Sequence, residues 1–216
     1  MSIILIGGEK GGTGKTTLAT NLATLQALKG RKVVLIDTDI QASASFWSGV
    51  RDEAGIQPKV ACIQRLGKEL QKAIEDLAQH YQDILIDAGG RNSIELRAGL
   101  VTAERMFIPI QPSQFDIWTL GPIDELVRTA QRFNPKLKAW GIINRESTNP
   151  AVTEGVETQR LLADFPHLQL ANTLLRERIA YRKAARDGRC VAELQPMDPK
   201  AVEEMQSLYS EVFGYE

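Results

Sequence analysis

The feature that most constrains the fold is a glycine-rich segment near the start of the sequence, Gly7 to Thr17, which reads GGEKGGTGKTT. The short aliphatic run from Ser2 to Ile6 precedes it, and a stretch of helical length, Leu18 to Lys29, follows it. Glycines let the backbone turn so that successive N–H groups point into one cavity, and the following helix adds the positive end of its dipole. The segment therefore predicts an anion-binding loop between a buried strand and a helix.

Further aliphatic runs recur at 33–36, 84–86, 106–110 and 140–143. Because they are continuously apolar rather than alternating, we expect strands that are buried on both faces. The stretches between them, such as 66–81 and 117–133, carry apolar residues at helical spacing, and a closing helix is expected at 199–213. This alternation predicts an α/β fold with a doubly wound, mostly parallel sheet flanked by helices, as in P-loop NTPases. Since no linker or repeat divides the chain, residues 1–216 are expected to form a single domain.

The glycine-rich loop contains the residue types that bind a triphosphate. The strict pattern G-x-x-x-x-G-K-[ST] has glycine where this chain has Glu9, but its remaining positions match. In this interpretation Lys15 contacts the β- and γ-phosphates of ATP, Thr16 supplies its hydroxyl to Mg²⁺, and Thr17 caps the helix near the α-phosphate. The predicted cofactor-binding residues of the loop are Gly11, Gly12, Thr13, Gly14, Lys15, Thr16 and Thr17. The alternative is a glycine-rich turn with a solvated lysine.

Carboxylates follow two of the expected strands. Asp37 and Asp39 end the run at 33–36, on the same side of an extended chain, and Asp87 ends the run at 84–86 before Gly89 and Gly90. Such carboxylates at the edge where phosphates would lie suit a metal ion and a water molecule. Two alternatives remain open: Asp37 could cap a helix, and many buried strands end in aspartate because it forms turns.

A second lysine, Lys10, lies five residues before Lys15, and this spacing resembles the deviant phosphate loop of the ParA/MinD ATPases. The chain is most similar to the small single-domain plasmid partition ATPases of that family. The resemblance implies that Lys10 is a catalytic residue that reaches the partner's nucleotide across a dimer interface. It also implies that Asp39 orients the attacking water and that Asp37 supports the network of Mg²⁺ and Lys15. Asp87 would then hold Mg²⁺ as the acid of a Walker B strand.

Two further positions are implied by the same resemblance. Asn144 ends the run at 140–143, where an amide suits adenine because it offers a donor and an acceptor together. Asp116 lies in a Pro-Ser-x-x-Asp turn that resembles the dimer face of the family, but it could equally cap a helix. The chain departs from the family where Ile40 replaces a proline. Gly89 and Gly90 replace the Pro-Pro of many members but resemble the small single-domain plasmid partition ATPases.

The segment 176–189 carries six basic residues against two acidic ones. Five of the cations recur at three- and four-residue steps and would share one face of a helix: Arg178, Arg182, Lys183, Arg186 and Arg189. One interpretation is a solvated helix face with local ion pairs. The resemblance favours the other, a surface for the DNA backbone, and such contacts carry little base information, so binding would be non-specific.

Charge and cysteine content restrict the partners and the compartment. The formal net charge of −1 excludes a protein that coats nucleic acid by bulk positive charge. Two distant cysteines without a secretory signal indicate reduced thiols in a cytoplasmic protein. Residues 193–216 hold six acids and one base, so we expect no binding to anionic membranes.

Together these features predict a ParA-like, Mg²⁺-dependent ATPase that acts in the partitioning of a plasmid or chromosome. We expect ATP and Mg²⁺ as cofactors, a homodimer on ATP binding, non-specific DNA as a ligand, and a ParB-like centromere-binding adaptor that stimulates slow hydrolysis. The protein would be cytoplasmic and nucleoid-associated. The alternatives are a ParA-like positioning ATPase for a protein cargo, a metabolic ATP-dependent enzyme of the same superfamily, and a nucleotide-dependent scaffold without catalysis.

Overall fold

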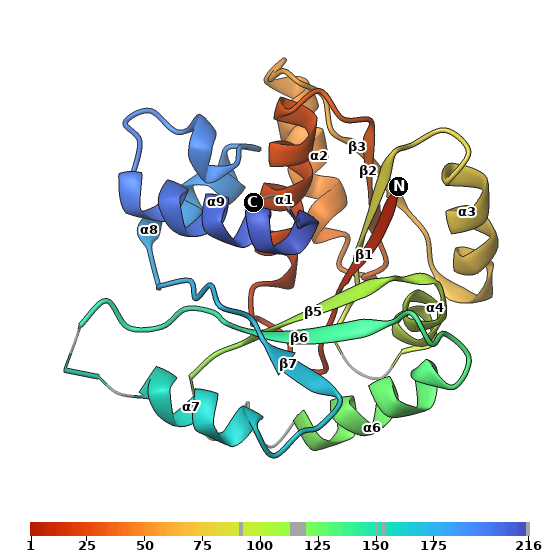
Figure 1. Ribbon diagram of the computed structural model, residues 1–216. Helices are drawn as coiled ribbons and strands as arrows, with labels where there is room; N and C mark the ends of the chain where they lie inside the picture. The colour runs from red at the N-terminus through yellow and green to blue at the C-terminus, as the bar shows by residue number, and fades with distance from the viewer. Residues whose placement is uncertain (91–92, 113–119, 150, 153, 215–216) are drawn as a thin grey trace.

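The computed structural model describes residues 1–90, 93–112, 120–149, 151–152 and 154–214 (Figure 1). Its strands form a seven-stranded sheet in the order β3-β2-β4-β1-β5-β6-β7, and every recorded pairing is parallel. The strands are β1 (Ser2–Ile6), β2 (Val33–Asp37), β3 (Ala61–Gln64), β4 (Asp83–Asp87), β5 (Arg105–Ile110), β6 (Lys138–Ile143) and β7 (Leu168–Leu170). The predicted doubly wound parallel sheet flanked by helices is confirmed.

Helices connect the strands and cover both faces of the sheet. They are α1 (Lys15–Leu28), α2 (Ser43–Glu53), α3 (Leu70–Leu77), α4 (Ile94–Thr102), α6 (Leu120–Gln131), α7 (Glu154–Leu162), α8 (Ile179–Arg186) and α9 (Pro199–Phe213), with short 3₁₀ turns η1 (Gly67–Glu69) and η2 (Val191–Glu193). Helices α1, α2, α8 and α9 lie on one face, and α3, α4, α6 and α7 lie on the other (Figure 1).

The register of the central strands brings their carboxyl ends to one edge. Ile6 of β1 and Asp37 of β2 are both opposite Asp87 of β4. Strands β2, β3 and β4 lie on one side of β1, and β5, β6 and β7 lie on the other. The winding direction of the sheet therefore reverses beside β1. Ligands of such sheets bind outside the carboxyl ends of the strands at this point. The glycine-rich segment, which begins directly after Ile6, lies there.

Alternation along the strands divides the core in two. Ile4 and Ile6 of β1 point to the cluster under α1, α2, α8 and α9, whereas Leu5 between them belongs to the cluster under α3, α4, α6 and α7. In β2, Val33 and Leu35 belong to the first cluster, whereas Val34 and Ile36 belong to the second. Both faces of the central strands are thus buried, which explains why their sequences are continuously apolar.

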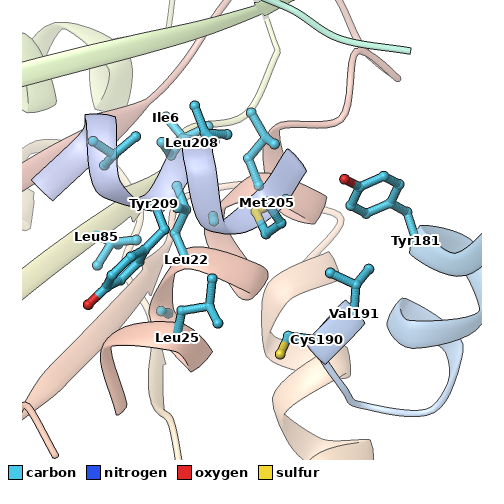
Figure 2. Packing of buried hydrophobic residues seen from close by; sticks show 14 of the residues in the cluster. Ile6, Leu22, Leu25, Leu85, Tyr181, Cys190, Val191, Met205, Leu208 and Tyr209 are labelled. Atoms are coloured by element: carbon cyan, nitrogen blue, oxygen red, sulfur yellow. The ribbon is translucent and has the colours of Figure 1, made fainter. Parts of the chain in front are cut away.

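The closing helix was predicted at its observed bounds, and it packs against α1. Met205, Leu208 and Tyr209 of α9 lie in the cluster with Leu22 and Leu25 of α1 (Figure 2). The Tyr209 hydroxyl donates to Gln26 Oε1 at 2.6 Å. Figure 2 also shows Tyr181 of α8 and the Cys190–Val191 segment facing the same cluster, so the carboxyl-terminal part of the chain is built onto α1.

Candidate functional site

The glycine-rich segment forms the turn from β1 to α1 at the carboxyl edge of the sheet. Gly12 and Gly14 have φ angles of 78° and 101°, a region that favours glycine. Gly14 is the N-cap residue of α1, and a Cβ at this position would collide with the amide of Asn144. No side chain in the described part of the protein accepts the first N–H groups of the helix at this cap. These groups and the helix dipole therefore face the edge as an anion site.

Lys15 is buried inside this loop, at 7% exposure. Its Nζ donates to the carbonyl oxygen of Lys10 at 2.7 Å. Burial lowers the pKa of the Lys15 amine, while the nearby carboxylates of Asp87 and Asp39 act in the opposite direction. The structure therefore places the ammonium group of Lys15 between the loop and two of the predicted site carboxylates.

Asp87 is the most perturbed acid at this edge. It is 2% exposed, and burial raises its pKa to about 7, with the Asp37 and Asp39 carboxylates adding to the effect and the adjacent Thr16 hydroxyl and Lys15 opposing it. Neither of its carboxylate oxygens has a hydrogen-bond partner among the described residues. A buried carboxylate without a protein partner is costly and suits a cation.

A magnesium ion fits these residues better than a metal that needs a cage of side chains. Mg²⁺ is held by one or two carboxylates together with substrate phosphates and water, and Asp87 with the Thr16 hydroxyl matches that donor set. Within the described ranges, no group of three or more His, Cys, Asp or Glu side chains could hold a metal by itself. Thr13 Oγ1 is a further buried group without a hydrogen bond to any described residue, and it lies in the same loop.

The contacts of Asp37 favour one of the two interpretations that the sequence left open. Its Oδ2 accepts from the Ser45 N–H at 2.8 Å and from the Ser45 hydroxyl at 2.9 Å, and its Oδ1 accepts from the Asp39 N–H at 3.1 Å. Ser45 lies in the first turn of α2, so the fully buried Asp37 caps that helix. Of the two interpretations left open, the helix cap is the one that these contacts support, because a bond from Asp37 to Mg²⁺ would have to compete with them.

Asp39 lies in the turn between β2 and α2. Its Oδ1 accepts from the Gln41 N–H at 2.9 Å. A Cβ at Gly89 would lie 3.2 Å from the Asp39 carboxylate, and a Cβ at Gly90 would lie 3.3 Å from the Glu9 carbonyl oxygen. The glycine pair after Asp87 therefore lets the Asp39 turn and the phosphate loop approach the end of β4. Ile40, which replaces the proline of the family, is 82% exposed.

Asn144 contacts the phosphate loop directly. It is buried, and its Nδ2 donates to the carbonyl oxygen of Thr13 at 2.6 Å. It also lines a pocket of about 80 Å³, with further lining residues Gly14, Thr17, Leu18, Arg145, Leu175, Arg176, Glu177, Arg178, Tyr181, Arg182 and Ala185. A role in base recognition remains a prediction.

Comparison with known proteins identifies the family. The model of the CobQ/CobB/MinD/ParA nucleotide-binding domain matches residues 4–191. The chain belongs to the ParA/MinD family. It is 28% identical over 97% of its length to the maintenance of carboxysome distribution protein A of Halothiobacillus neapolitanus, and the match covers 95% of that protein. It is 27% identical over 92% of its length to the chromosome-partitioning ATPase Soj of Thermus thermophilus, of which 90% is covered.

Solved structures of this family have a similar fold. The structure of the septum site-determining protein MinD from Pyrococcus horikoshii, complexed with Mg-ADP, superposes with a TM-score of 0.76 over 98% of this chain and 95% of MinD, at 20% identity. The chain therefore has the P-loop NTPase fold of MinD, and its family model describes a nucleotide-binding domain. Among its described helices, none is long and apolar enough to span a membrane.

The basic segment of this ParA/MinD protein differs from the expected single helical face. Helix α8 spans only Ile179–Arg186, because Arg178 before it is extended (φ −125°, ψ 139°) and Gly188 after it is left-handed (φ 63°). Arg178 is 13% exposed and bonded through its guanidinium to Glu204 of α9. The prediction that Arg178 and Arg189 lie on one helical face with the other three cations is therefore wrong.

The remaining cations stay on the surface. Arg182, Lys183 and Arg186 of α8 are exposed, and Arg186 also pairs with the neighbouring Asp187. Asp116 of the expected dimer-face turn lies outside the described residues.

Sequence reasoning missed part of the pocket beside Asn144. Arg145 has a left-handed backbone (φ 57°) and pairs with Glu177, whose Oε2 lies 3.5 Å from its Nε. Tyr181 is buried against α9, with its hydroxyl 3.3 Å from the Ala201 carbonyl oxygen. Arg145 directly follows Asn144, whereas Glu177 and Tyr181 belong to the basic segment 176–189, in which Arg178, Tyr181 and Gly188 match an Arg-x-x-Tyr and glycine pattern of the partition ATPases. No motif joins these two segments, so the sequence did not group them.

Proposed function

We propose that this protein is a Mg²⁺-dependent ATPase whose nucleotide state controls its binding to DNA, and that it partitions a plasmid or chromosome. The observation that carries the proposal is the arrangement at the carboxyl edge of the sheet. Lys15, Thr16 and Asp39 surround Asp87, whose buried oxygens have no hydrogen-bond partner among the described residues. Membership in the ParA/MinD family supports ATP as the nucleotide.

The hydrolytic chemistry follows from these positions. The N–H groups at Gly14 and the first turn of α1 receive the phosphates, and Lys15 exchanges its bond to the Lys10 carbonyl for the β- and γ-phosphate oxygens. Thr16 and Asp87 would hold Mg²⁺, which would supply positive charge to the phosphate oxygens. Asp39 orients the attacking water. No strong general base is needed, because phosphoryl transfer depends chiefly on positioning and electrostatic stabilisation.

Dimerisation would complete the site. Lys10 is half-buried at the rim of the loop, and in this proposal it extends to the nucleotide of a second protomer. Two α8 helices in one dimer would bind a DNA backbone far more tightly than one, since the second contact becomes intramolecular. Hydrolysis then releases DNA by dissociating the dimer. A ParB-like adaptor at the centromere stimulates this slow step, and the protein is cytoplasmic and nucleoid-associated.

The exposed cations Arg182, Lys183 and Arg186 form the proposed DNA surface. Arg178 contributes less than the sequence implied, because Glu204 already accepts its hydrogen bonds. Arg189 lies beyond the helix on the turn after Gly188, and its Nη1 is 3.4 Å from the Glu193 carbonyl oxygen. Binding should be sequence-neutral and strongly dependent on salt.

A second candidate has a specific observation in its favour. The similarity to a maintenance of carboxysome distribution protein over nearly the whole chain suggests that the same ATP cycle could position a protein cargo instead of a replicon. The two candidates share the ATPase site and differ in the adaptor. Deleting the gene in its host separates them, since the first predicts loss of a replicon and the second predicts misplaced protein assemblies with normal replicon inheritance.

The shared part of the proposal is tested by size-exclusion chromatography with ATP, with ADP and without nucleotide, followed by binding to a mixed-sequence duplex over a salt series. We expect a dimer and DNA binding only with ATP. A protein that stays monomeric and does not bind DNA in any nucleotide state would refute the switch. The double variant Arg182→Glu/Arg186→Glu should keep ATP binding and reduce the log–log salt slope by about 4, because each of the two protomers in the dimer loses two phosphate contacts. The matched control reverses two exposed arginines on the opposite face, Arg132→Glu/Arg160→Glu, and should behave as wild type.

A further inference from the structure

Helix α2 connects the nucleotide edge to the turn that follows the basic helix α8. Its amino end is attached to the Asp37–Asp39 segment, because Asp37 caps it through the backbone and hydroxyl of Ser45. The residue before the helix, Ala42, has a left-handed backbone (φ 53°), which is unfavourable for a residue with a Cβ. A change in the position of Asp39 would therefore reach α2 through a short, constrained connection.

Arg51 anchors the carboxyl end of α2. Although it is an arginine, it is only 1% exposed. Its Nη1 and Nη2 donate to the two carboxylate oxygens of Glu193, each at 2.8 Å. Nη1 also donates to the Gly188 carbonyl oxygen at 3.1 Å, and Nη2 to the Pro58 carbonyl oxygen at 2.8 Å. One guanidinium thus joins α2 to both ends of the turn between α8 and η2.

Other contacts hold the same turn between α2 and α1. The indole Nε1 of Trp47, one turn before Arg51 on α2, lies 3.3 Å from the Arg189 carbonyl oxygen. A Cβ at Gly188 would lie 2.5 Å from the backbone nitrogen of Arg51, so the turn lies directly against α2. From the other side, Asn21 of α1 accepts the Val191 N–H at 2.9 Å. Since α1 begins at the phosphate loop, a shift of α2 relative to α1 would move the turn between α8 and η2.

The chemistry of the anchor favours positioning over simple stabilisation. A buried ion pair loses hydration, and apolar residues of similar volume are often as stable or more stable at such sites. A bidentate guanidinium–carboxylate pair, in contrast, fixes distance and orientation in two directions. Glu193 is also fixed from its own side, since its Oε2 accepts the Cys190 N–H at 2.9 Å.

We propose that Arg51 is a positioning residue that couples the nucleotide at Asp39 to the orientation of α8 within one protomer. The γ-phosphate shifts the Asp39 turn, α2 moves with it, and Arg51 moves the Gly188 turn and the end of α8 that carries Arg186. The cations of α8 are then presented differently to DNA in the ATP and ADP states. This inference rests on the proposed function for its DNA ligand, but it acts before dimerisation.

The test compares Arg51→Met with wild type, using a control that loses a similar ion pair elsewhere. Arg31→Met removes the guanidinium that bonds both oxygens of the fully buried Asp83, away from α2 and α8. The first readout is amide hydrogen exchange of residues 187–193 with ADP and with a non-hydrolysable ATP analogue, at a protein concentration low enough that size-exclusion chromatography shows only monomer with either nucleotide. Both nucleotides carry the same base, so direct contact of the base with the pocket beside α8 cancels. The second readout is the ratio of affinities for a mixed-sequence duplex in the two states.

We expect an exchange difference of about tenfold between the nucleotides in wild type and in Arg31→Met, within the usual range of coupling between sites, and a difference under about twofold in Arg51→Met. Trp47→Phe keeps the core filled but loses the bond to Arg189, so it should retain only part of the difference even if Arg51→Met does not fold. The inference is overturned if folded Arg51→Met shows the same exchange difference between the nucleotides as wild type does. It is also overturned if Arg51→Met is unfolded and Trp47→Phe keeps the full difference, or if wild type itself shows no difference. If wild type shows the exchange difference but binds no DNA, the proposed function fails and the coupling stands.

Discussion

Replacing Asp87 by asparagine should stabilise the nucleotide-free protein at neutral and alkaline pH while abolishing its ATPase activity. The carboxylate is buried and its oxygens have no hydrogen-bond partner among the described residues, and burial raises its pKa from an ordinary 3.8 to about 7. The folded protein therefore retains this proton up to about pH 7, whereas the unfolded chain loses it near pH 4. Since the folded state binds more protons in this window, its stability falls as the pH rises from about 4 to 7.

The size of the effect follows from the two pKa values. Each unit of difference corresponds to about 1.4 kcal/mol, so above pH 7 the charge destabilises the folded state by about 4 kcal/mol, and at pH 5 by about 1–2 kcal/mol. Asparagine does not titrate, although its buried amide costs about 1–3 kcal/mol at every pH. That constant cost cancels when two pH values are compared. The stability advantage of Asp87→Asn should thus grow by about 2–3 kcal/mol between pH 5 and pH 8.

Thermal or urea unfolding without nucleotide or Mg²⁺ across this range measures the difference. For a chain of this length, 2–3 kcal/mol corresponds to a relative Tm change of about 4–12 °C. Asp164→Asn, at an exposed position, reports the effect of losing one surface charge, and its stability should change with pH as that of wild type does. If the stability of Asp87→Asn also follows the pH dependence of wild type, the Asp87 carboxylate is not held in the environment described, and its assignment as a metal ligand loses its physical basis.

Three other substitutions test neighbouring parts of the molecule. Asp39→Ala should retain ATP binding and trap the ATP-bound dimer, which size-exclusion chromatography and phosphate release would reveal; normal hydrolysis would show that another group orients the water. Gly14→Ala should abolish nucleotide binding in a fluorescent-nucleotide titration, because a Cβ would collide with Asn144 at a φ of 101°; Gly11→Ala has open space around its Cβ and should be much milder. Gly188→Ala should lower the unfolding free energy by about 1–3 kcal/mol, since a Cβ would lie 2.5 Å from Arg51 N at a left-handed φ; unchanged urea denaturation would contradict the close packing of this turn on α2.

The central strands and the phosphate loop could be predicted because their signals are local. Continuous apolar runs follow from burial on both faces, and the glycine spacing follows from the backbone turn into α1. The edge strands β3 and β7 were not predicted. β3 (Ala61–Gln64) is only partly buried, and β7 (Leu168–Leu170) has three residues with two of them exposed, so neither carries a continuous apolar run.

The residues of the site that the sequence could not assign depend on contacts between distant segments. The sequence does not distinguish Asp37 from Asp39 as a metal ligand. The two hydrogen bonds that Ser45, eight residues later, donates to Asp37 favour a helix cap at that position. In the same way, Arg178 matches the spacing of the basic residues, but Glu204 of α9 holds it against the body of the protein. Charge periodicity identified a basic segment, and tertiary ion pairing decides which of its cations face solvent.

The parallel arrangement of the sheet also has a practical consequence for labelling. Ser2 opens β1 at the amino edge of the sheet, five residues before the phosphate loop at the opposite edge. Val212, near the end of the described residues, lies at the same amino edge, because the Arg105 guanidinium at the start of β5 donates to its carbonyl oxygen at 2.6 Å. A fluorescent protein or surface tether attached next to Ser2 or after Val212 would therefore start at the edge opposite the phosphate loop.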